Sequence, residues 1–291
     1  MSHTSVLKEE LIRYLNPKAN ENFIDATLGE AGHSLAILEK TGPKGKILGI
    51  DQGLALLKIS KKNLENRGFG KRVILVCDNF SNLKKIVKEN NFLNADGIIF
   101  DLGMSLWHLE KSKRGFSFLR NEFLDMRYSS KKQELTAREI VNNWEQEEIE
   151  KILKEYGEEK FVSRISKEIV KSRKQNPITT TFDLVEIIRR VVPGWYLKKR
   201  IHPSTKTFMA LRIAVNDELE NLKKGLRQAI EVIKIGGRIG VVSFHSLEDR
   251  IVKNFLREKA KDSVIKILTK KPIRPTLEEV KNNPASRSAK L

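Results

Sequence analysis

The stretch of sequence that decides the fold is Asp25-Ala26-Thr27-Leu28-Gly29-Glu30-Ala31-Gly32-His33. It joins an apolar segment at 22–28, which reads as a strand, to an amphipathic segment at 30–41, which reads as a helix. Glycines in such a turn let the backbone approach a ligand closely, and the first N–H groups of the helix point at that ligand. The stretch therefore predicts a site for an adenosine-containing cofactor.

The alternation of strand and helix continues beyond this turn as far as residue 101. Apolar runs at 46–51, 72–78 and 95–101 read as strands, and amphipathic segments at 54–66 and 80–90 read as helices. Strands that are apolar almost throughout and separated by helices indicate a parallel sheet covered on both faces. The predicted fold class is therefore α/β, with a Rossmann-like, mostly parallel sheet and helices on both faces.

The pattern changes after Gly103. Residues 108–202 contain no convincing strand, and Thr136 and Thr181 are expected helix caps. The helices predicted in this part lie at 135–143, 145–156, 159–174 and 181–192. We therefore expect an all-helical insert at 108–202, of the size of a small domain, within an α/β domain formed by 1–107 and 203–291.

The α/β pattern returns in the last third of the chain. A long helix at 205–232 is expected to lead through a glycine turn into a strand at 239–244. A helix at 247–261, a short strand at 264–268 and an antiparallel edge strand at 286–291 complete the prediction. This ending is the layout of methyltransferases whose last strand is antiparallel.

Acidic residues end three of the predicted strands. Asp51 lies 22 positions after Gly29, where a carboxylate accepts hydrogen bonds from both ribose hydroxyls of an adenosine cofactor. Asp78-Asn79-Phe80 is expected near the adenine, although Phe80 reads almost equally well as a core residue. Asp101 lies at the switch point of the sheet, where ligands bind. The same order of strands, glycine loop and acidic residues also suits NAD. Two features favour S-adenosylmethionine: the loop is not a full G-x-G-x-x-G, and the chain is expected to end with an antiparallel strand.

Composition limits the partners and the compartment. The net charge is +18, and it rises along the chain from +3 (residues 1–107) to +6 (108–202) and +9 (203–291). Such a basic chain suggests an anionic partner, with nucleic acid first and a lysine-rich solvated surface as the alternative.

A single cysteine, Cys77, and the absence of a membrane-spanning or secretion segment predict a cytoplasmic protein. The five histidines show no metal-ligand spacing, so no metal site is expected.

Several motifs together resemble one family, from His3 to Leu291. The N-terminal and central ones are His3-Thr4-Ser5-Val6-Leu7, the 25–34 loop, Asp101-Leu102-Gly103-Met104-Ser105, Arg114-Gly115-Phe116-Ser117-Phe118, Leu124-Asp125-Met126-Arg127 and Tyr156-Gly157-Glu158-Glu159. The C-terminal ones are Thr207-Phe208, Ala210-Leu211-Arg212, Gly236-Gly237-Arg238, Ser243-Phe244-His245-Ser246-Leu247-Glu248-Asp249-Arg250, Asn283-Pro284 and Ser286-Arg287-Ser288. They resemble the bacterial methyltransferases that modify the exocyclic N4 amine of a cytidine in small-subunit (16S) ribosomal RNA.

The resemblance implies S-adenosylmethionine as cofactor and a target in the decoding region. The cofactor positions that it implies are Ala31, Gly32, His33, Asp51, Phe80, Asp101 and His108. The chain departs from the family pattern at three places: Ala31 replaces a glycine, Gln52 replaces an arginine, and Leu106-Trp107-His108 replaces Ser-Pro-Gln.

The chemistry requires an acceptor for a hydrogen of the cytosine amine, because the amine lone pair is delocalised into the ring. Asp101 is the first candidate, with His245 as a contact to the base or a phosphate or as a proton relay. The target base must leave its stack. The aromatic residues placed to enclose it are Trp107, Phe116, Phe118 and Phe244. For each aromatic taken singly a core position is the favoured interpretation, whereas for the run from Ser243 to Ser246 a functional role is favoured.

Basic residues of the motifs are the expected RNA contacts. Arg114 and Arg127 are expected to bind RNA or to order a substrate loop, and Arg250 to bind phosphate or to pair with Glu248 or Asp249. Further candidates are Lys131, Lys132, Lys206 and Arg212. The expected partner is small-subunit ribosomal RNA within the assembled or assembling subunit, and a homodimer is one option. The rival interpretations are a non-catalytic RNA-binding or assembly factor and a nicotinamide-dependent oxidoreductase.

Overall fold

The computed structural model describes residues 5–130 and 133–291. It divides into two compact units. The sheet unit comprises the chain up to Gly103 together with Leu219–Leu291, and the helical unit comprises Met104–Glu218. Each unit is described separately below.

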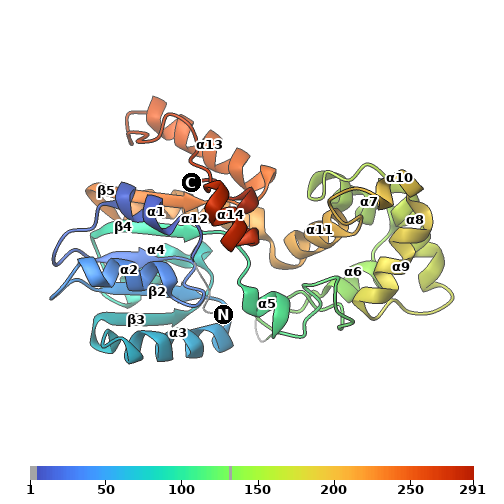
Figure 1. Cartoon of the computed structure of the whole chain (residues 1–291), viewed down its shortest axis with the longest axis horizontal. Coiled ribbons are helices and arrows are strands. Elements are labelled where there is room, and N and C mark those ends of the chain that lie inside the picture. The colour runs from blue at the N-terminus through green and yellow to red at the C-terminus, as the bar shows by residue number, and fades with distance from the viewer. Residues whose placement is uncertain (1–4, 131–132) are drawn as a thin grey trace. The chain divides into compact units, whose positions relative to one another are not determined.

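The sheet unit is built on one sheet of five parallel strands in the order β3-β2-β1-β4-β5 (Figure 1). The strands are β1 (Phe23–Asp25), β2 (Ile47–Asp51), β3 (Val73–Cys77), β4 (Ala95–Asp101) and β5 (Ile233–Val242). The order reverses between β1 and β4, which makes the carboxyl ends of these two strands the switch point at which ligands bind in open α/β sheets. The predicted parallel α/β fold is confirmed.

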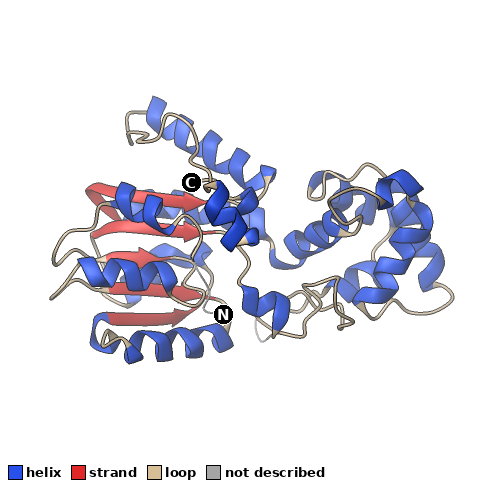
Figure 2. Ribbon diagram, viewed as in Figure 1, coloured by secondary structure: helices blue, strands red, loops and turns tan. Residues whose placement is uncertain are grey.

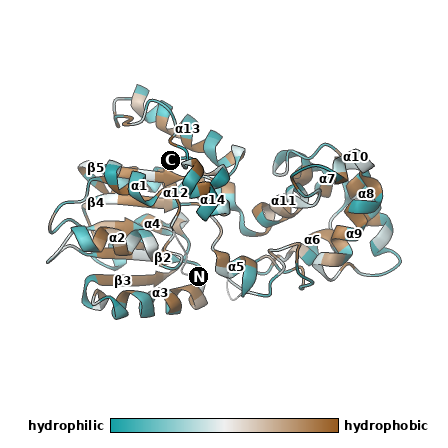
Figure 3. Ribbon diagram, viewed as in Figure 1, coloured by the Kyte–Doolittle hydropathy of each residue, from teal (hydrophilic) through white to brown (hydrophobic). Residues whose placement is uncertain are grey.

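Helices cover both faces of the sheet (Figure 2). Phe23 packs on the face covered by α1, α2 and α3, and its neighbour Ile24 packs on the face covered by α4, α12 and α13. These helices are α1 (Lys8–Leu15), α2 (Gly32–Lys40), α3 (Leu54–Asn66), α4 (Leu83–Glu89), α12 (Glu218–Val232) and α13 (Ser246–Lys261). Figure 3 shows the apolar character of β3, as expected for a strand with helices on both sides. Among the described helices, none is both long enough and apolar enough to cross a bilayer.

The C-terminal part of the chain differs from the prediction. Residues 264–268 form no strand, and the segment predicted as the edge strand contains the 3₁₀ helix η3 (Pro284–Ser288). A single antiparallel bridge, between Ser243 and Lys290, joins this segment to the chain just after β5. The predicted strand at 264–268 is therefore wrong, and the predicted antiparallel edge strand at 286–291 is reduced to this one bridge, because η3 occupies the first part of that segment. The other short elements are α14 (Leu277–Asn282), η1 (Gly70–Arg72) and η2 (Phe80–Asn82).

The long helix predicted at 205–232 is two helices. The break lies at Asp217, whose φ of 48° is left-handed, so that α11 (Thr205–Asn216) ends there and α12 begins at Glu218. The first of the two packs against α6 and α7 and belongs to the helical unit. The unit boundaries therefore lie at 104 and 218, whereas the sequence had placed them at 108 and 202.

The helical unit has its own apolar core. Its helices are α5 (Leu106–Glu110), α6 (Ala137–Asn143), α7 (Gln146–Glu155), α8 (Val162–Arg173), α9 (Thr181–Val191), α10 (Gly194–Leu197) and α11. Thr136 caps α6 as predicted, since its side chain accepts the N–H of Glu139. The cap of α9 is Thr180, whose side chain accepts the N–H of Asp183, and Thr181 is buried in the first turn. The predicted cap is therefore displaced by one residue.

Candidate functional site

The loop after β1 has a strained backbone that its neighbours hold in place. Gly29 and Ala31 both lie in the left-handed region, with φ of 52° and 69°. Ala31 is fully buried and precedes the first residue of α2. The Oγ of Ser60, in α3, donates a hydrogen bond to the carbonyl of Gly29. Because this conformation costs an alanine roughly 1–2 kcal/mol, the loop keeps its shape only through such contacts.

Asp51 joins this loop to the end of β2. Its Oδ2 accepts the N–H of Gly29 at 3.0 Å, and its Oδ1 accepts the N–H of Gly53 at 2.7 Å. Burial raises the pKa of Asp51 to about 6, against the opposing effect of these two donors. Each carboxylate oxygen has a further lone pair, so the carboxylate can still accept hydrogen bonds from a ligand.

Gly32 is fixed by the N-terminal segment. A methyl group at this position would lie 1.9 Å from the Oγ of Ser5, which is itself buried. Ser5, in the N-terminal motif, therefore packs closely against the cofactor loop at Gly32. His3 and Thr4 of the same motif lie outside the described residues.

His33 and Asp101 form a buried pair at the switch point. Nε2 of His33 lies 3.3 Å from Oδ2 of Asp101, and the two side chains are 5% and 18% exposed. The N–H of Asp101 donates to the hydroxyl of Thr27 in the cofactor loop at 2.6 Å. Burial lowers the pKa of His33, but the hydrogen bond and charge of Asp101 and the charge of Asp25 outweigh it, so the pKa is raised.

One oxygen of this pair has no hydrogen-bond partner. Among the described residues, nothing donates to Oδ1 of Asp101, although the atom is buried. A buried carboxylate oxygen normally accepts a hydrogen bond, so Oδ1 is an acceptor ready for a ligand N–H group. The sequence predicted His33 and Asp101 as separate site residues, and the structure brings them together.

Asp25 is a buried acid of this site that sequence reasoning did not single out. It is 2% exposed, and its carboxylate accepts hydrogen bonds from the hydroxyl of Ser34 at 2.7 Å and the N–H of Thr27 at 3.2 Å. Burial raises the pKa of Asp25. Its position at the end of β1, inside the loop that decides the fold, was the available signal.

Phe80 lies at the end of the β3 segment as predicted, but its ring packs into the core. It meets Phe100 edge to face at 5.6 Å, and a methyl group at Gly225 would lie 2.6 Å from it. Nearby, the side-chain amide of Asn79 donates to Gln52 at 3.1 Å. Phe80 is partly exposed, so its predicted role beside the adenine stays a prediction.

His108 belongs to the helical unit, whereas the other predicted cofactor residues belong to the sheet unit. Its ring is 5% exposed and packs against Phe116 and Tyr128, with centroids 5.1 and 5.0 Å away. Burial, followed by the charges of Arg114 and Arg212, lowers the pKa of His108 to about 3. The ring is therefore neutral at neutral pH, and its cofactor role stays a prediction.

Arg114 and Arg127 order a loop of the helical unit. The guanidinium of Arg114 donates to the carbonyls of Arg127 and Tyr128 at 3.0 and 3.1 Å. The guanidinium of Arg127 donates two hydrogen bonds to the carboxylate of Asp125, at 2.8 and 2.7 Å. These contacts correspond to loop ordering, the second of the two roles expected for both arginines. RNA contact by either residue stays a prediction.

The other basic candidates lie elsewhere. Arg212 forms a nearly buried, two-pronged ion pair with Glu218, and Arg250 is exposed on α13. Asp249 binds Lys253 and Lys290 at 3.0 and 2.7 Å. The predicted residues Lys131 and Lys132 lie outside the described residues.

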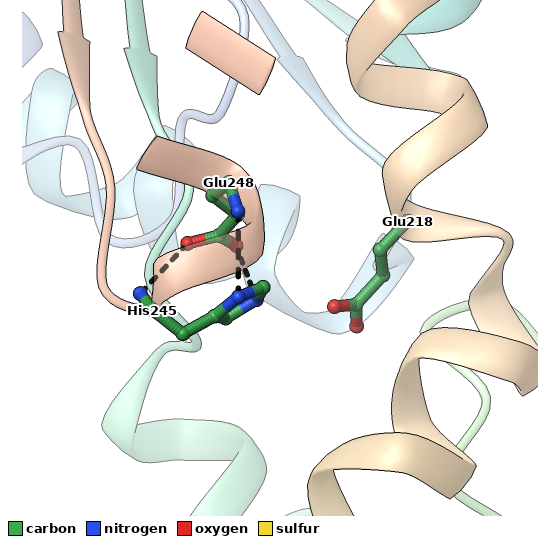
Figure 4. A group of neighbouring side chains, drawn as sticks. All are labelled: Glu218, His245 and Glu248. Carbon is green, nitrogen blue, oxygen red and sulfur yellow. Dashed lines mark hydrogen bonds and ion pairs between the residues drawn. The ribbon is translucent and has the colours of Figure 1, made fainter. Parts of the chain in front are cut away.

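His245 and Glu248 build the start of α13 (Figure 4). Nε2 of His245 lies 3.1 Å from Oε1 of Glu248, and Oε2 of Glu248 accepts the N–H of Phe244 at 2.8 Å. Glu248 is 4% exposed. Phe244 closes over Gly103, where a methyl group would lie 2.7 Å from its ring. This motif therefore fixes the chain at the carboxyl end of β5.

The remaining aromatic candidates all have partners within the helical unit. Trp107 meets His108 edge to face, and Phe116 stacks on Tyr128 with centroids 5.4 Å apart. Phe118 stacks on His202 at 4.6 Å. Phe116 is a core residue, whereas Phe118 is partly exposed.

A family model and curated relatives show the family of this chain. The sequence profile described as "MraW methylase family" matches residues 1–291. The chain is 44% identical to "Ribosomal RNA small subunit methyltransferase H" of Halothermothrix orenii, over 100% of this chain and 97% of the relative. It is 45% identical to the protein of the same name from a Sulfurihydrogenibium species, over 100% and 98%. A crystal structure titled as a putative rRNA-methylase from Clostridium thermocellum is 14% identical, covers 96% of this chain and 92% of that chain, and has a TM-score of 0.45.

Proposed function

We propose that this chain, which belongs to the MraW methylase family, transfers the methyl group of S-adenosylmethionine to the exocyclic N4 amine of a cytidine in small-subunit ribosomal RNA. The observation that carries the proposal is the buried Oδ1 of Asp101 at the switch point, which accepts no hydrogen bond from the described residues. The relatives named for methylation of small-subunit ribosomal RNA support the substrate class.

The sheet unit fits the cofactor. The N–H groups at the start of α2 offer backbone donors, and Asp51 offers acceptors for ribose hydroxyls. Phe80 and His108 complete the proposed set of cofactor contacts. When bound, S-adenosylmethionine supplies an electrophilic methyl group on a positively charged sulfur.

Asp101 is the proposed acceptor for the reacting amine. A carboxylate oxygen that binds one N–H of the amine opposes delocalisation of the nitrogen lone pair into the ring. As the new carbon–nitrogen bond forms, the amine becomes acidic, and its proton passes to the carboxylate or to water. Holding the amine in line supplies roughly 7–11 kcal/mol of the barrier, so a carboxylate of ordinary basicity is sufficient.

His245 is proposed to shape the site and to contact the base or a phosphate. Its ring lies against Glu248, and the backbone from Phe244 to His245 donates to the same carboxylate. The proposed function of the helical unit is recognition of the RNA, within the assembled or assembling small subunit and in the cytoplasm.

The proposal is tested with purified protein, S-adenosylmethionine labelled in the methyl group, and small subunits from cells that lack this activity. We expect label in N4-methylcytidine after nucleoside analysis, and loss of at least about 100-fold in rate for Asp101→Ala. Label on a ring carbon or a ribose would refute the amine assignment. A thermal shift with NAD but none with S-adenosylhomocysteine would refute the cofactor assignment.

A further inference from the structure

We infer that an exposed aromatic and basic surface of the helical unit binds an unpaired segment of the RNA substrate, and this inference rests on the proposed function. The surface, here called the Trp195 platform, consists of Phe161, Arg164, Trp195, Lys198, Lys199 and Arg200. None of these residues belongs to the motifs that identified the family.

Each of the two rings of the platform has a cation beside it. The guanidinium of Arg164 lies 5.8 Å from the Phe161 ring, which meets Trp195 at 5.9 Å. The ammonium of Lys199 lies 4.8 Å from the centroid of the Trp195 ring. Trp195 nevertheless keeps 55% of its surface exposed, which is unusual for so large a side chain.

The rings are held on a rigid base. Tyr196, next to Trp195, is 6% exposed and packs against Phe161 at 4.9 Å. Its hydroxyl donates to the carboxylate of Glu159, which also accepts the N–H of Lys160 and of Phe161. Trp195 therefore projects from a fixed support, and stacking on it requires little further ordering.

The segment that carries Trp195 is rich in positive charge. Residues 189–206 contain six basic residues and no acidic residue. Lys198, Lys199 and Arg200 are consecutive and exposed. Such a segment attracts phosphates, and the flexible stem of Lys199 lets its ammonium move from the ring to a phosphate when a base stacks.

These features favour unpaired RNA over a duplex. An exposed tryptophan face stacks on a base, and only an unpaired base can offer its face while the neighbouring cations hold the backbone. The rings of the platform can therefore bind the base of a nucleotide, and the cations can bind its phosphate.

The experiment measures binding of a single-stranded fragment of small-subunit ribosomal RNA to the full chain. We expect Trp195→Ala to weaken binding by about 5- to 150-fold, and Trp195→Phe to retain most of it, because phenylalanine also stacks. The triple variant Lys198→Glu/Lys199→Glu/Arg200→Glu should also reduce the slope of log affinity against log salt by about 2.

A matched control changes the same charge on another surface. Lys58, Lys61 and Lys62 are exposed on α3, so their triple replacement by Glu alters the net charge equally. The platform triple should weaken RNA binding much more than the α3 triple. Equal weakening would overturn the inference, because general attraction to a basic protein would explain both.

Two further outcomes are decisive. If the platform triple loses binding to anionic phospholipid vesicles and keeps binding to RNA, the surface recognises lipid and the inference is wrong. If the Trp195 variants bind RNA as tightly as the wild type, the inference about the platform is wrong. If the wild type still methylates small subunits in that case, the proposed function stands. An unchanged far-UV circular dichroism spectrum and an unchanged midpoint of thermal unfolding for each variant show that both units are folded.

Discussion

Replacing His33 by glutamine removes the positive partner of Asp101. The two side chains lie 3.3 Å apart, where unit charges in an effective dielectric of about 20 attract by about 5 kcal/mol. Breaking a buried pair by removing one partner costs about 3–5 kcal/mol, because the remaining charge is left unpaired. We therefore expect His33→Gln to lower the free energy of unfolding by about 3 kcal/mol at about pH 6.

The loss should depend on pH in a defined direction. Because the pKa of His33 is raised above its ordinary 6.5, its stabilising effect is complete below about pH 6.5 and disappears as the pH rises through the raised pKa. The groups that act on this imidazole are Asp101 and Asp25, which favour its charge, and Lys8, which opposes it. Urea denaturation of wild type and variant at several pH values measures the difference.

His108→Gln is the matched control with the opposite sign. Since burial lowers the pKa of His108 to about 3, the unfolded chain takes up a proton below about pH 6.5 that the folded chain does not. This costs the wild type about 2 kcal/mol between about pH 6.5 and 5, and glutamine removes the cost. A loss in His33→Gln that is the same at about pH 6 and pH 9 would refute the ion pair.

Three further substitutions test the cofactor loop. Gly32→Ala places a methyl group 1.9 Å from the Oγ of Ser5, so we expect a loss of about 1–3 kcal/mol in urea denaturation, most of it recovered in Gly32→Ala/Ser5→Ala. Ala31→Gly removes a left-handed alanine worth about 1–2 kcal/mol and a buried methyl group worth about 0.8 kcal/mol, so calorimetry should show stability within about 1 kcal/mol of wild type. Burial raises the pKa of Asp51 to about 6. Ionisation of this group therefore lowers the free energy of unfolding as the pH rises from about 4 to about 6, and the loss is constant at higher pH. Asp51→Asn should therefore be as stable as wild type at about pH 8, yet bind S-adenosylhomocysteine at least about tenfold more weakly by titration calorimetry.

The sheet could be predicted because its signal is local. The strand at 95–101 and the helix at 54–66 have the bounds that the sequence indicated, since each is a long apolar or amphipathic run between clear turn residues. The break at Asp217 was missed because apolar periodicity continues across it. An Asn-Asp pair, which tolerates left-handed backbone, was the available signal. The strand at 264–268 was wrong because a strand requires a partner, and no local pattern specifies one.

The positions of the candidate residues at the strand ends could be predicted from the sequence, and their pairings could not. Acids at the ends of parallel strands must meet at one edge of the sheet, so Asp51 and Asp101 were found from topology alone. The pairing of His33 with Asp101, and of Arg127 with Asp125, depends on side-chain directions that the sequence does not encode locally.

The positive charges of the helical unit differ in whether they are available to an RNA phosphate. The arginines that lie within the specific motifs, Arg114 and Arg127, donate their hydrogen bonds to carbonyls and a carboxylate of their own loop. A guanidinium held by two or more internal acceptors has fewer donors left for a phosphate. The exposed cations of the helical unit include Lys198, Lys199 and Arg200, which no motif singled out. If the motif arginines shape the loop and the platform binds RNA, Arg127→Ala should lower stability with little change in the salt slope of RNA binding, whereas the platform triple should do the reverse.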